Sequence, residues 1–290
     1  MDAAALTAQL GGFWRRSYGT SPCPVCQPER RRDQNALTLA NGPRGLLLHC
    51  KKAGCSFHQI LAAAGITAGA WAMPDLAEIA KREAEERAEV ERRAEQARSL
   101  WREASPISGT IGETYLRSRG ITCVLPSTLR FAPSCWHVSA RRLPALVALV
   151  EGSGGFAVHR TYLRSDGFGK AKVDPPKAML GPTSGGAVRL SSAPGRLVVA
   201  EGIETGLSLL SGLLGETSTV WAALSTSGLR SLSLPSQPGR LAIALDGDAP
   251  GRSAGHALAE RAHALGWHVS FLEPPGGCDF NDVLTGRLGQ

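Results

Sequence analysis

The sequence predicts a multi-domain α/β protein, and three observations lead to this fold class. Short apolar runs at residues 197–200 and 241–245 are each followed by a helical pattern, as expected of buried strands in a parallel sheet. Four cysteines in two close pairs lie within the first 55 residues, which is typical of a small metal-binding module. An abrupt change of composition after the cysteines predicts a linker between this module and the rest of the chain.

The composition indicates a polyanionic partner. The 290 residues carry a net charge of +7 with a pI near 9.3, and a hydrophobic fraction of 43% permits real cores. No apolar run approaches the ~20 residues that span a bilayer, and the N-terminus lacks a signal-peptide pattern, so we expect a cytoplasmic protein without membrane contact. Seven cysteines, an odd number with four clustered, favour metal ligation in a reducing compartment over a disulfide framework.

The charges are segregated along the chain. Residues 106–190 contain 11 Lys and Arg against four Asp and Glu, whereas residues 191–290 contain six against nine. A high-GC preference for Arg over Lys would explain the identity of these residues but not their segregation. The C-terminal segment is therefore acidic, and the segment before it is basic.

Residues 1–65 predict a zinc-binding module. The pattern C-x₂-C-x₂₃-C-x₄-C places two ligand pairs on turns, with a β-hairpin around Asn41-Gly42-Pro43 between them. Four thiolates make a closed, structural Zn²⁺ site with no open position for catalysis. The expected ligands are Cys23, Cys26, Cys50 and Cys55. Four buried free cysteines are the alternative, and His49 or His58 could replace one ligand.

The basic triplet Arg30, Arg31 and Arg32 is expected to contact phosphates, unless it is an ordinary solvated face.

Residues 66–105 predict a charged helical linker. The segment from Pro74 to about Ala104 has no Gly, and Glu precedes Arg by four residues at several positions, which stabilises a helix. Its apolar positions are too sparse for a sustained coiled coil. We expect a solvated spacer, with partner binding as the alternative.

Residues 106–190 predict a basic α+β segment. A short helix near residues 112–116 precedes strands at 128–131, 145–150 and 155–163. A Gly/Pro-rich loop follows, with basic side chains at Arg164, Lys170, Lys172 and Lys177. This loop is expected to bind nucleic acid or nucleotides; a structural domain with a solvated basic loop is the alternative.

Residues 191–290 alternate strands and helices, which predicts a Rossmann-like parallel sheet. Glu201 follows the first strand, and Asp246 and Asp248 follow the third, so all three lie at the carboxyl edge of the sheet. Clustered carboxylates repel one another unless a cation holds them, and they suit Mg²⁺ or Mn²⁺. Glu204 is expected to favour the N-terminus of the first helix rather than to approach the cation.

The order strand-Glu-Gly, then strand-Asp-x-Asp, resembles the Toprim domain of primases and topoisomerases. The cysteine module resembles the zinc ribbon at the N-terminus of primases, and residues 106–190 resemble the amino-terminal part of the primase catalytic core. The resemblance implies that a basic face beside the metal site holds template and product, with Arg160 and Lys177 as phosphate ligands. Asp279, in Asp279-Phe280-Asn281-Asp282, resembles the Asp-x-Asn-Asp ending of phage and plasmid Toprim domains, which implies a place near the cation; capping of a short helix is the alternative.

The resemblance to bacterial replicative primase implies a DNA primase, a nucleotidyltransferase of DNA replication. It would synthesise short RNA primers from nucleoside triphosphates on single-stranded DNA, with carboxylate-bound Mg²⁺ as the catalytic cofactor. A non-catalytic DNA-binding protein of recombination and repair, and a Toprim nuclease, are the alternatives. The chain has no G-x-x-x-x-G-K-[ST] motif, so helicase activity would come from a separate partner.

Overall fold

The computed structural model describes residues 2–15, 17–31, 33–42, 45–66, 76–245 and 247–286, with the backbone alone at 76, 78 and 79. Two site residues expected from the sequence, Arg32 and Asp246, lie outside the described residues, as does the expected helix start at Pro74. The chain forms two compact units, Met1–Glu86 and Arg87–Gln290. Within the described residues, no helix is both long and apolar enough to cross a membrane.

The first unit is a small antiparallel sheet with two helices. Its strands, in spatial order, are β1 (Phe13–Arg15), β2 (Tyr18–Ser21), β3 (Leu37–Gly42) and β4 (Gly45–Cys50). The helices are α1 (Ala3–Gln9) and α2 (Phe57–Ala63). Leu6, Leu37, Leu39 and Ile60 are fully buried and form the centre of a core that also includes Cys23 and Cys50. Strands β3 and β4 are the hairpin that the sequence predicts.

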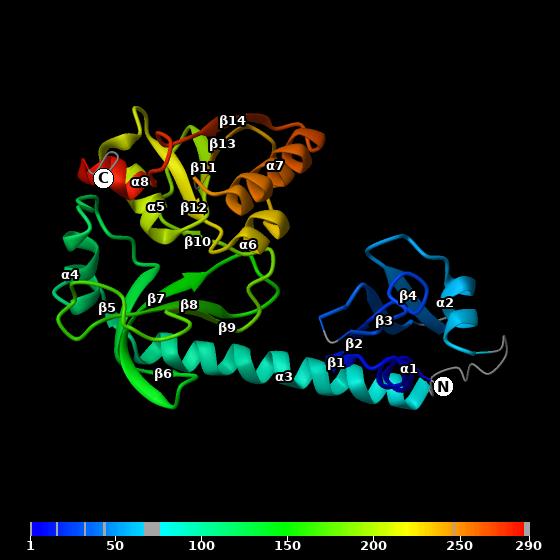
Figure 1. The fold of residues 1–290 in the computed structure, drawn as a ribbon. Helices are drawn as coiled ribbons and strands as arrows, with labels where there is room; N and C mark the ends of the chain where they lie inside the picture. The colour runs from blue at the N-terminus through cyan, green and yellow to red at the C-terminus, as the bar shows by residue number, and fades with distance from the viewer. Residues whose placement is uncertain are drawn as a thin grey trace. The chain divides into compact units, whose positions relative to one another are not determined.

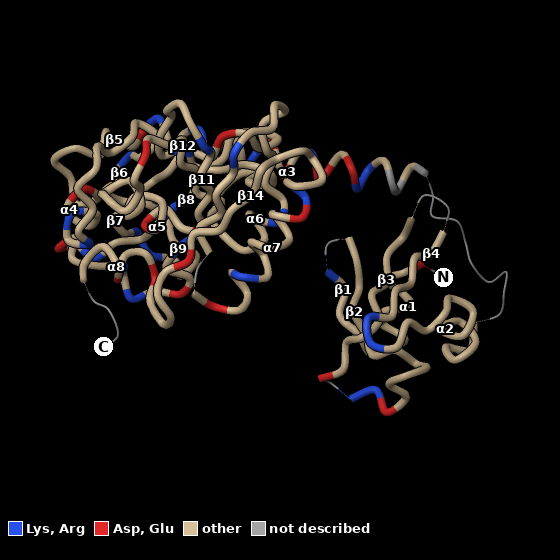
Figure 2. Tube along the Cα trace, turned by 90° about the horizontal axis from the view of Figure 1, so that it is seen from above, with Lys and Arg blue, Asp and Glu red and all other residues tan. Residues whose placement is uncertain are grey.

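Helix α3 (Leu76–Glu103) runs from the first unit into the second. Acidic and basic residues alternate along it, as Figure 2 shows. The expectation of a solvated spacer is wrong for its last third, because Ala94 and Ala97 are buried. There the helix packs on a sheet through Ala97, Leu100 and Trp101, so this part of α3 belongs to the second unit.

That sheet is antiparallel and follows chain order: β5 (Ser105–Pro106), β6 (Leu129–His137), β7 (Arg141–Val150), β8 (Ala157–Tyr162) and β9 (Lys177–Leu180). Its side chains alternate between two faces. Val158 and Tyr162 of β8 face the core that contains α3, whereas Ala157 faces the other core. Helix α4 (Ile111–Ser118) lies on this second face (Figure 1). Strands β5 and β9 are too short for the sequence pattern to show.

The last part of the chain contains the expected parallel sheet, in the order β10-β12-β11-β13-β14. These strands are β10 (Val188–Arg189), β11 (Arg196–Ala200), β12 (Ser218–Ala222), β13 (Arg240–Ala244) and β14 (His268–Leu272). All pairs among β11 to β14 are parallel, and β10 is an antiparallel edge strand. The prediction of an α/β fold with a parallel C-terminal sheet is confirmed.

Helices cover both faces of the parallel sheet (Figure 1). One face packs on α5 (Ile203–Ser208), the π-helical turn η1 (Leu209–Leu213) and α8 (Phe280–Thr285). The other packs on α6 (Thr226–Ser231) and α7 (Ala249–Ala264). Helix α5 passes directly into η1, and the helical geometry ends there with Gly212, which adopts a positive φ of 122°.

One core joins the two sheets of the second unit. Leu146 and Ala148 of β7 belong to the same buried cluster as Val198 of β11 and Leu207 of α5. Because this apolar contact is continuous, the basic middle segment and the C-terminal segment form a single packed body. Side chains at the edges of both sheets therefore belong to the same packed body.

Candidate functional site: a cysteine cluster, a carboxylate edge and a buried ion cluster

The four expected cysteines converge in the first unit. Cys23 and Cys26 lie in the turn after β2, Cys50 ends β4, and Cys55 precedes α2. Their sulfur atoms lie within 4.8 Å of one another, and the Cys26 and Cys50 sulfurs are 3.6 Å apart. A Zn–S bond of about 2.3 Å requires sulfurs about 3.8 Å apart in a tetrahedron. The donor set and its spacing therefore fit one structural Zn²⁺, as the sequence predicts.

Backbone groups favour the thiolate form of one of these cysteines, Cys50. Burial alone would raise the pKa of the Cys50 thiol, but backbone N–H groups of Ala53, Cys55 and Lys52 donate to its sulfur and lower that pKa to about 6. The buried Gln27 side chain accepts hydrogen bonds from the N–H groups of Cys23 and Ala36, at 3.2 and 3.0 Å, and fixes the first turn.

The carboxylate edge lies at the ends of β11 and β13. These strands pair in parallel with Ala200 opposite Ala244, so Glu201 and Leu245 leave the sheet at the same edge. Glu201 is half-buried, and its backbone carbonyl accepts a hydrogen bond from the Leu224 N–H at 2.7 Å. Asp246 itself lies outside the described residues. The register therefore places Glu201 where the sequence expects it.

The two other expected carboxylates cap helices. Asp248 is exposed and accepts the Gly251 N–H at the start of α7, at 2.7 Å. Asp279 forms a capping box with Asp282 at the start of α8, and its carboxylate accepts the Asp282 N–H at 2.8 Å. Among the described residues, the cysteines alone form a group of three or more metal ligands, so Glu201, Asp248 and Asp279 are not gathered into one.

The segment around Asp248 and the segment around Asp279 are nevertheless neighbours. A Cβ atom added at Gly247 would lie 3.1 Å from the carbonyl oxygen of Cys278. The carboxyl ends of β13 and β14 are thus adjacent, as their parallel pairing requires. Capping by Asp279, one of the two roles expected from its sequence, is confirmed; a place near a cation stays a prediction.

A buried ion cluster lies one helical turn from Glu201. Glu204, in the first turn of α5, is 6% exposed. Its carboxylate pairs with Lys170 at 3.1 Å and Lys177 at 3.2 Å, and accepts a hydrogen bond from the Tyr115 hydroxyl at 2.8 Å. The expectation that Glu204 merely favours its helix N-terminus is therefore wrong. Its carboxylate connects α5 with α4, β9 and the loop before β9.

The electrostatics of this cluster follow from burial and from the two lysines. Burial alone would raise the pKa of Glu204, but Lys177 and Lys170 hold it well below its usual range. Burial also lowers the pKa of Lys170, and the Lys177 charge adds to that effect, while Glu204 opposes it. Burial, followed by the charge of Glu204, raises the pKa of Tyr115, which keeps its hydroxyl a hydrogen-bond donor.

His159 lies beneath the cluster and is 4% exposed. Burial lowers its pKa to about 4, and the charges of Lys177, Arg160 and Lys170 contribute in the same direction against Glu204. Its Nδ1 atom has no hydrogen-bond partner in the described part of the chain. His159 is therefore a neutral imidazole at pH 7.

Arg160 and Lys177 do not share a face. Lys177 pairs with Thr161 of β8 across the strands, and residues 160 and 161 of a strand point to opposite faces. The Arg160 guanidinium donates to the carbonyls of Trp136 and Met179, at 3.3 and 3.4 Å, on the face that carries α3. The expected single basic face is thus divided between two faces of the sheet.

The remaining expected phosphate ligands lie at the surface. Arg30 and Arg31 are exposed in the loop after the first cysteine pair, and Lys172 is exposed in the loop before β9. Tyr115 and His159 were not expected from the sequence as neighbours of the site. Their chain positions, 89 and 45 residues before Glu204, carry no pattern that would indicate this contact.

The fold and this edge define a Rossmann-like domain with acidic residues at the carboxyl ends of its strands. This domain matches a known family. Residues 196–289 match the family model described as Toprim domain, so the C-terminal part of the chain is a Toprim domain. Residues 91–190 match a model described as a domain of unknown function, DUF7146. The search of curated proteins found no match.

Solved primase structures are similar to this chain. The zinc-binding and RNA polymerase domains of Aquifex aeolicus primase align over 99% of this chain and 80% of that one, with 15% identity and a TM-score of 0.44. The RNA polymerase domain of Mycobacterium tuberculosis primase DnaG aligns over 67% and 77%, with 16% identity and a TM-score of 0.38. The primase fragment of the bacteriophage T7 primase-helicase protein aligns over 64% and 71%, with 14% identity and a TM-score of 0.36.

The cysteine cluster predicts one tightly bound Zn²⁺ per chain. Structural zinc contributes about 10–16 kcal/mol of apparent binding free energy in small modules, so Cys50→Ser should lose the metal and unfold the first unit. Cys123→Ser, at a half-buried cysteine of the second unit, should retain the zinc. Elemental analysis and circular dichroism measure both effects. Freshly purified wild-type protein that contains no zinc would refute the assignment.

The ion cluster predicts that Glu204→Gln lowers the free energy of unfolding by about 3 kcal/mol, because two partly buried ammonium groups lose their counter-charge. Glu216→Gln is the matched control, since Glu216 also pairs with two cations but its side chain is 45% exposed. In Glu216→Gln the free energy of unfolding should fall by less than about 1 kcal/mol, because the lost ion pairs are exposed. Urea denaturation measures both, and equal losses would contradict the role given to Glu204.

His159 predicts a pH dependence of stability between about pH 6.5 and 4. Its unfolded pKa is about 6.5 and its folded pKa is lowered to about 4, so the unfolded chain binds the extra proton. Stability is therefore complete above the unfolded pKa and falls on acidification, by up to about 1.4 kcal/mol per pH unit. His159→Gln lacks the imidazole, so its free energy of unfolding, measured between pH 6 and 5, should show a smaller dependence on pH than that of the wild type. Stability curves that stay parallel for the two proteins would exclude it.

Proposed function

We propose that the protein is a DNA primase-like nucleotidyltransferase that synthesises short RNA primers on single-stranded DNA. The observation that carries the proposal is the edge of the Toprim domain, where the parallel register of β11 and β13 sets the strand end before Glu201 beside the strand end that precedes Asp246 in the sequence. Carboxylate oxygens are the ligands that Mg²⁺ prefers, so the donor set fits the ion. Bound there, Mg²⁺ would activate the attacking 3′-hydroxyl and stabilise the leaving pyrophosphate.

The ion cluster supplies a second argument. Glu204 lies within the first turn after Glu201, and its carboxylate oxygen is 3.8 Å from where a Cβ at Gly202 would be. Lys170 and Lys177 are therefore held beside the carboxylate edge, and their side chains remain about a third exposed. Two cations compensated by a single buried carboxylate leave net positive charge at the surface, which favours binding of nucleotide or template phosphates.

In this mechanism each residue has a separate task. Glu201, Asp246 and Asp248 bind the catalytic cations, with Asp279 at the adjacent strand end. Lys170 and Lys177 bind phosphates beside them, and Lys172 extends the basic loop. Arg30, Arg31 and Arg32 of the zinc-binding unit contact the backbone of the template. Arg160 has a positioning task, because its guanidinium is already bound to the carbonyls of Trp136 and Met179.

The proposal extends to partners and setting. The template is single-stranded DNA, and the substrates are ribonucleoside triphosphates. Unwinding of the duplex would be the task of a replicative helicase. The reaction would serve DNA replication, of a chromosome or of a phage or plasmid genome, in the cytoplasm.

The test is primer synthesis by the purified full chain on single-stranded DNA with labelled ribonucleotides and Mg²⁺. Asp246→Ala and Glu201→Gln should abolish synthesis, since each removes a negative charge that binds the cation, while DNA binding persists. Glu260→Gln, at an exposed carboxylate of the same domain, is the control and should remain active. Gel analysis of the products separates primers from DNA fragments.

Three outcomes would contradict the proposed site or the proposed function. Full synthesis by both variants would remove the carboxylates from the mechanism. Cleavage of DNA by the wild type, lost in both variants, would establish a Toprim nuclease. Binding of DNA without any product would establish a binding protein.

A further inference from the structure

The loop between β8 and β9 presents an exposed aromatic ring next to the ion cluster. Its first turn is closed by backbone hydrogen bonds from the Arg164 N–H to the Gly169 carbonyl and from the Gly167 N–H to the Arg164 carbonyl, both at 3.0 Å. The Asp166 carboxylate accepts the Phe168 N–H at 2.9 Å. Although this turn is well fixed, the Phe168 side chain is 68% exposed. The turn therefore holds a large apolar ring in solvent at a defined position.

The turn is held directly against α4. Gly167 has a left-handed φ of 75°, and a Cβ atom there would lie 3.0 Å from the Thr114 methyl carbon and 3.2 Å from a methyl carbon of Ile111. Only glycine meets both conditions without strain. This contact fixes the position of Phe168 relative to α4.

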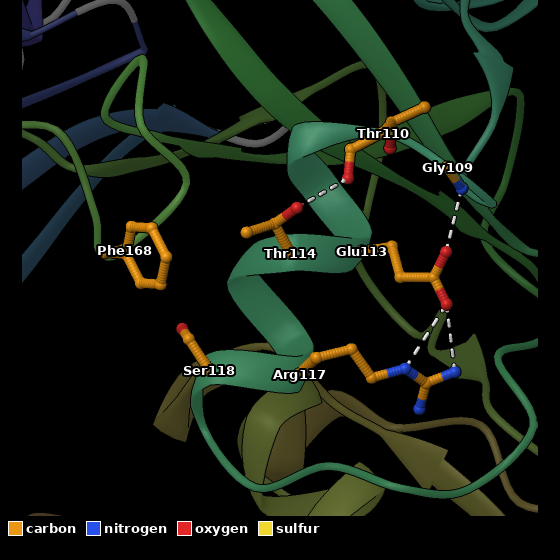
Figure 3. Close-up of a pocket in the computed structure, with 7 residues that line it drawn as sticks. All are labelled: Gly109, Thr110, Glu113, Thr114, Arg117, Ser118 and Phe168. Carbon is orange, nitrogen blue, oxygen red and sulfur yellow. Dashed lines mark hydrogen bonds and ion pairs between the residues drawn. The ribbon is translucent and has the colours of Figure 1, made fainter.

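A cavity of about 420 Å³ separates Phe168 from α4. Figure 3 shows Thr114 and Ser118 directed from the helix toward the ring, whereas Glu113 and Arg117 point to the other side and pair with each other at 3.1 Å. The volume is within the range of roughly 300–1,000 Å³ typical of small-molecule sites. One wall is aromatic, and the opposite wall carries the Thr114 methyl group and the Ser118 hydroxyl, whose oxygen donates to the Tyr115 carbonyl and can still accept. Such walls suit a flat heterocycle.

A second cavity of about 250 Å³ shares Phe168 and Ser118 with the first and has a different character. Lys170 and Arg119 line it, together with Asn281 of α8. Within the described residues the buried Nε atom of Arg119 has no hydrogen-bond partner. The second cavity therefore presents cations, and Lys170 links it to Glu204 and the carboxylate edge.

We propose that Phe168 is the base-stacking residue of a nucleotide site formed by these two cavities. The base of a ribonucleoside triphosphate stacks on the Phe168 ring, and its phosphates contact Lys170 and Arg119. The inference rests on the proposed function in one respect, since the nucleotide is its substrate. A stack is tolerant of base identity because every base has a π-face, as copying of a varied template requires.

The experiment measures binding of two probes, ATP and inorganic tripolyphosphate, to the full chain by calorimetry in Mg²⁺. Phe168→Ala should weaken ATP binding about tenfold, the loss of one base stack, and leave tripolyphosphate binding unchanged. Phe168→Trp should retain ATP binding, and Phe168→Leu should lose it as Phe168→Ala does, because leucine is apolar but cannot stack. Val138→Ala is the control, since Val138 is similarly exposed, at 72%, outside both cavities.

Three results would overturn the assignment: wild-type protein that does not bind ATP, unchanged ATP affinity in Phe168→Ala, or equal loss of ATP and tripolyphosphate. The measurement uses no template and no catalysis, so it is independent of primer synthesis. Protein that shows the expected binding pattern but makes no primers would refute the proposed function alone. Protein that makes primers while Phe168→Ala binds ATP normally would refute the stacking role alone.

Discussion

The arrangement of the second unit depends on the burial of one carboxylate. Glu204 is removed from water, and a charged group in that position is tolerated only when its lone pairs are occupied. Lys170, Lys177 and Tyr115 occupy them, and they come from three different parts of the chain. The requirement to neutralise Glu204 therefore positions α4, the β8–β9 loop and β9 around the first helix of the Toprim domain.

The apolar core supports the same arrangement without specifying it. Hydrophobic contacts are non-directional, so the shared cluster of β7, β11 and α5 residues tolerates small shifts between the two sheets. Hydrogen bonds supply the direction that the core lacks. The Asn281 amide donates to the carbonyl of Arg119 at 2.7 Å and to the Ser208 hydroxyl at 3.1 Å. The polar contacts thus fix α8 against both α4 and α5, and with it the end of the carboxylate edge.

The residues of the Asp279-Phe280-Asn281-Asp282 motif illustrate how one short segment can hold structural and chemical tasks together. Asp279 and Asp282 cap α8, Phe280 enters the shared core, and Asn281 binds the neighbouring elements. A capping carboxylate keeps lone pairs available for another partner, because each oxygen accepts more than one bond. Capping and cation binding are therefore compatible roles for Asp279, as they are for Asp248.

The sequence by itself determined the features that depend on local chemistry. Cysteine spacing predicted the four converging sulfurs, and apolar runs predicted β11 and β13 with Glu201 at the strand end, because periodicity and short-range spacing are local properties. It could not determine which charges meet across the chain. Glu204 finds Tyr115 89 residues away, and Arg160 and Lys177 separate to opposite faces through the pairing of β8 with β9. Only the tertiary structure decided these contacts, since strand register and burial depend on the packing of the whole unit.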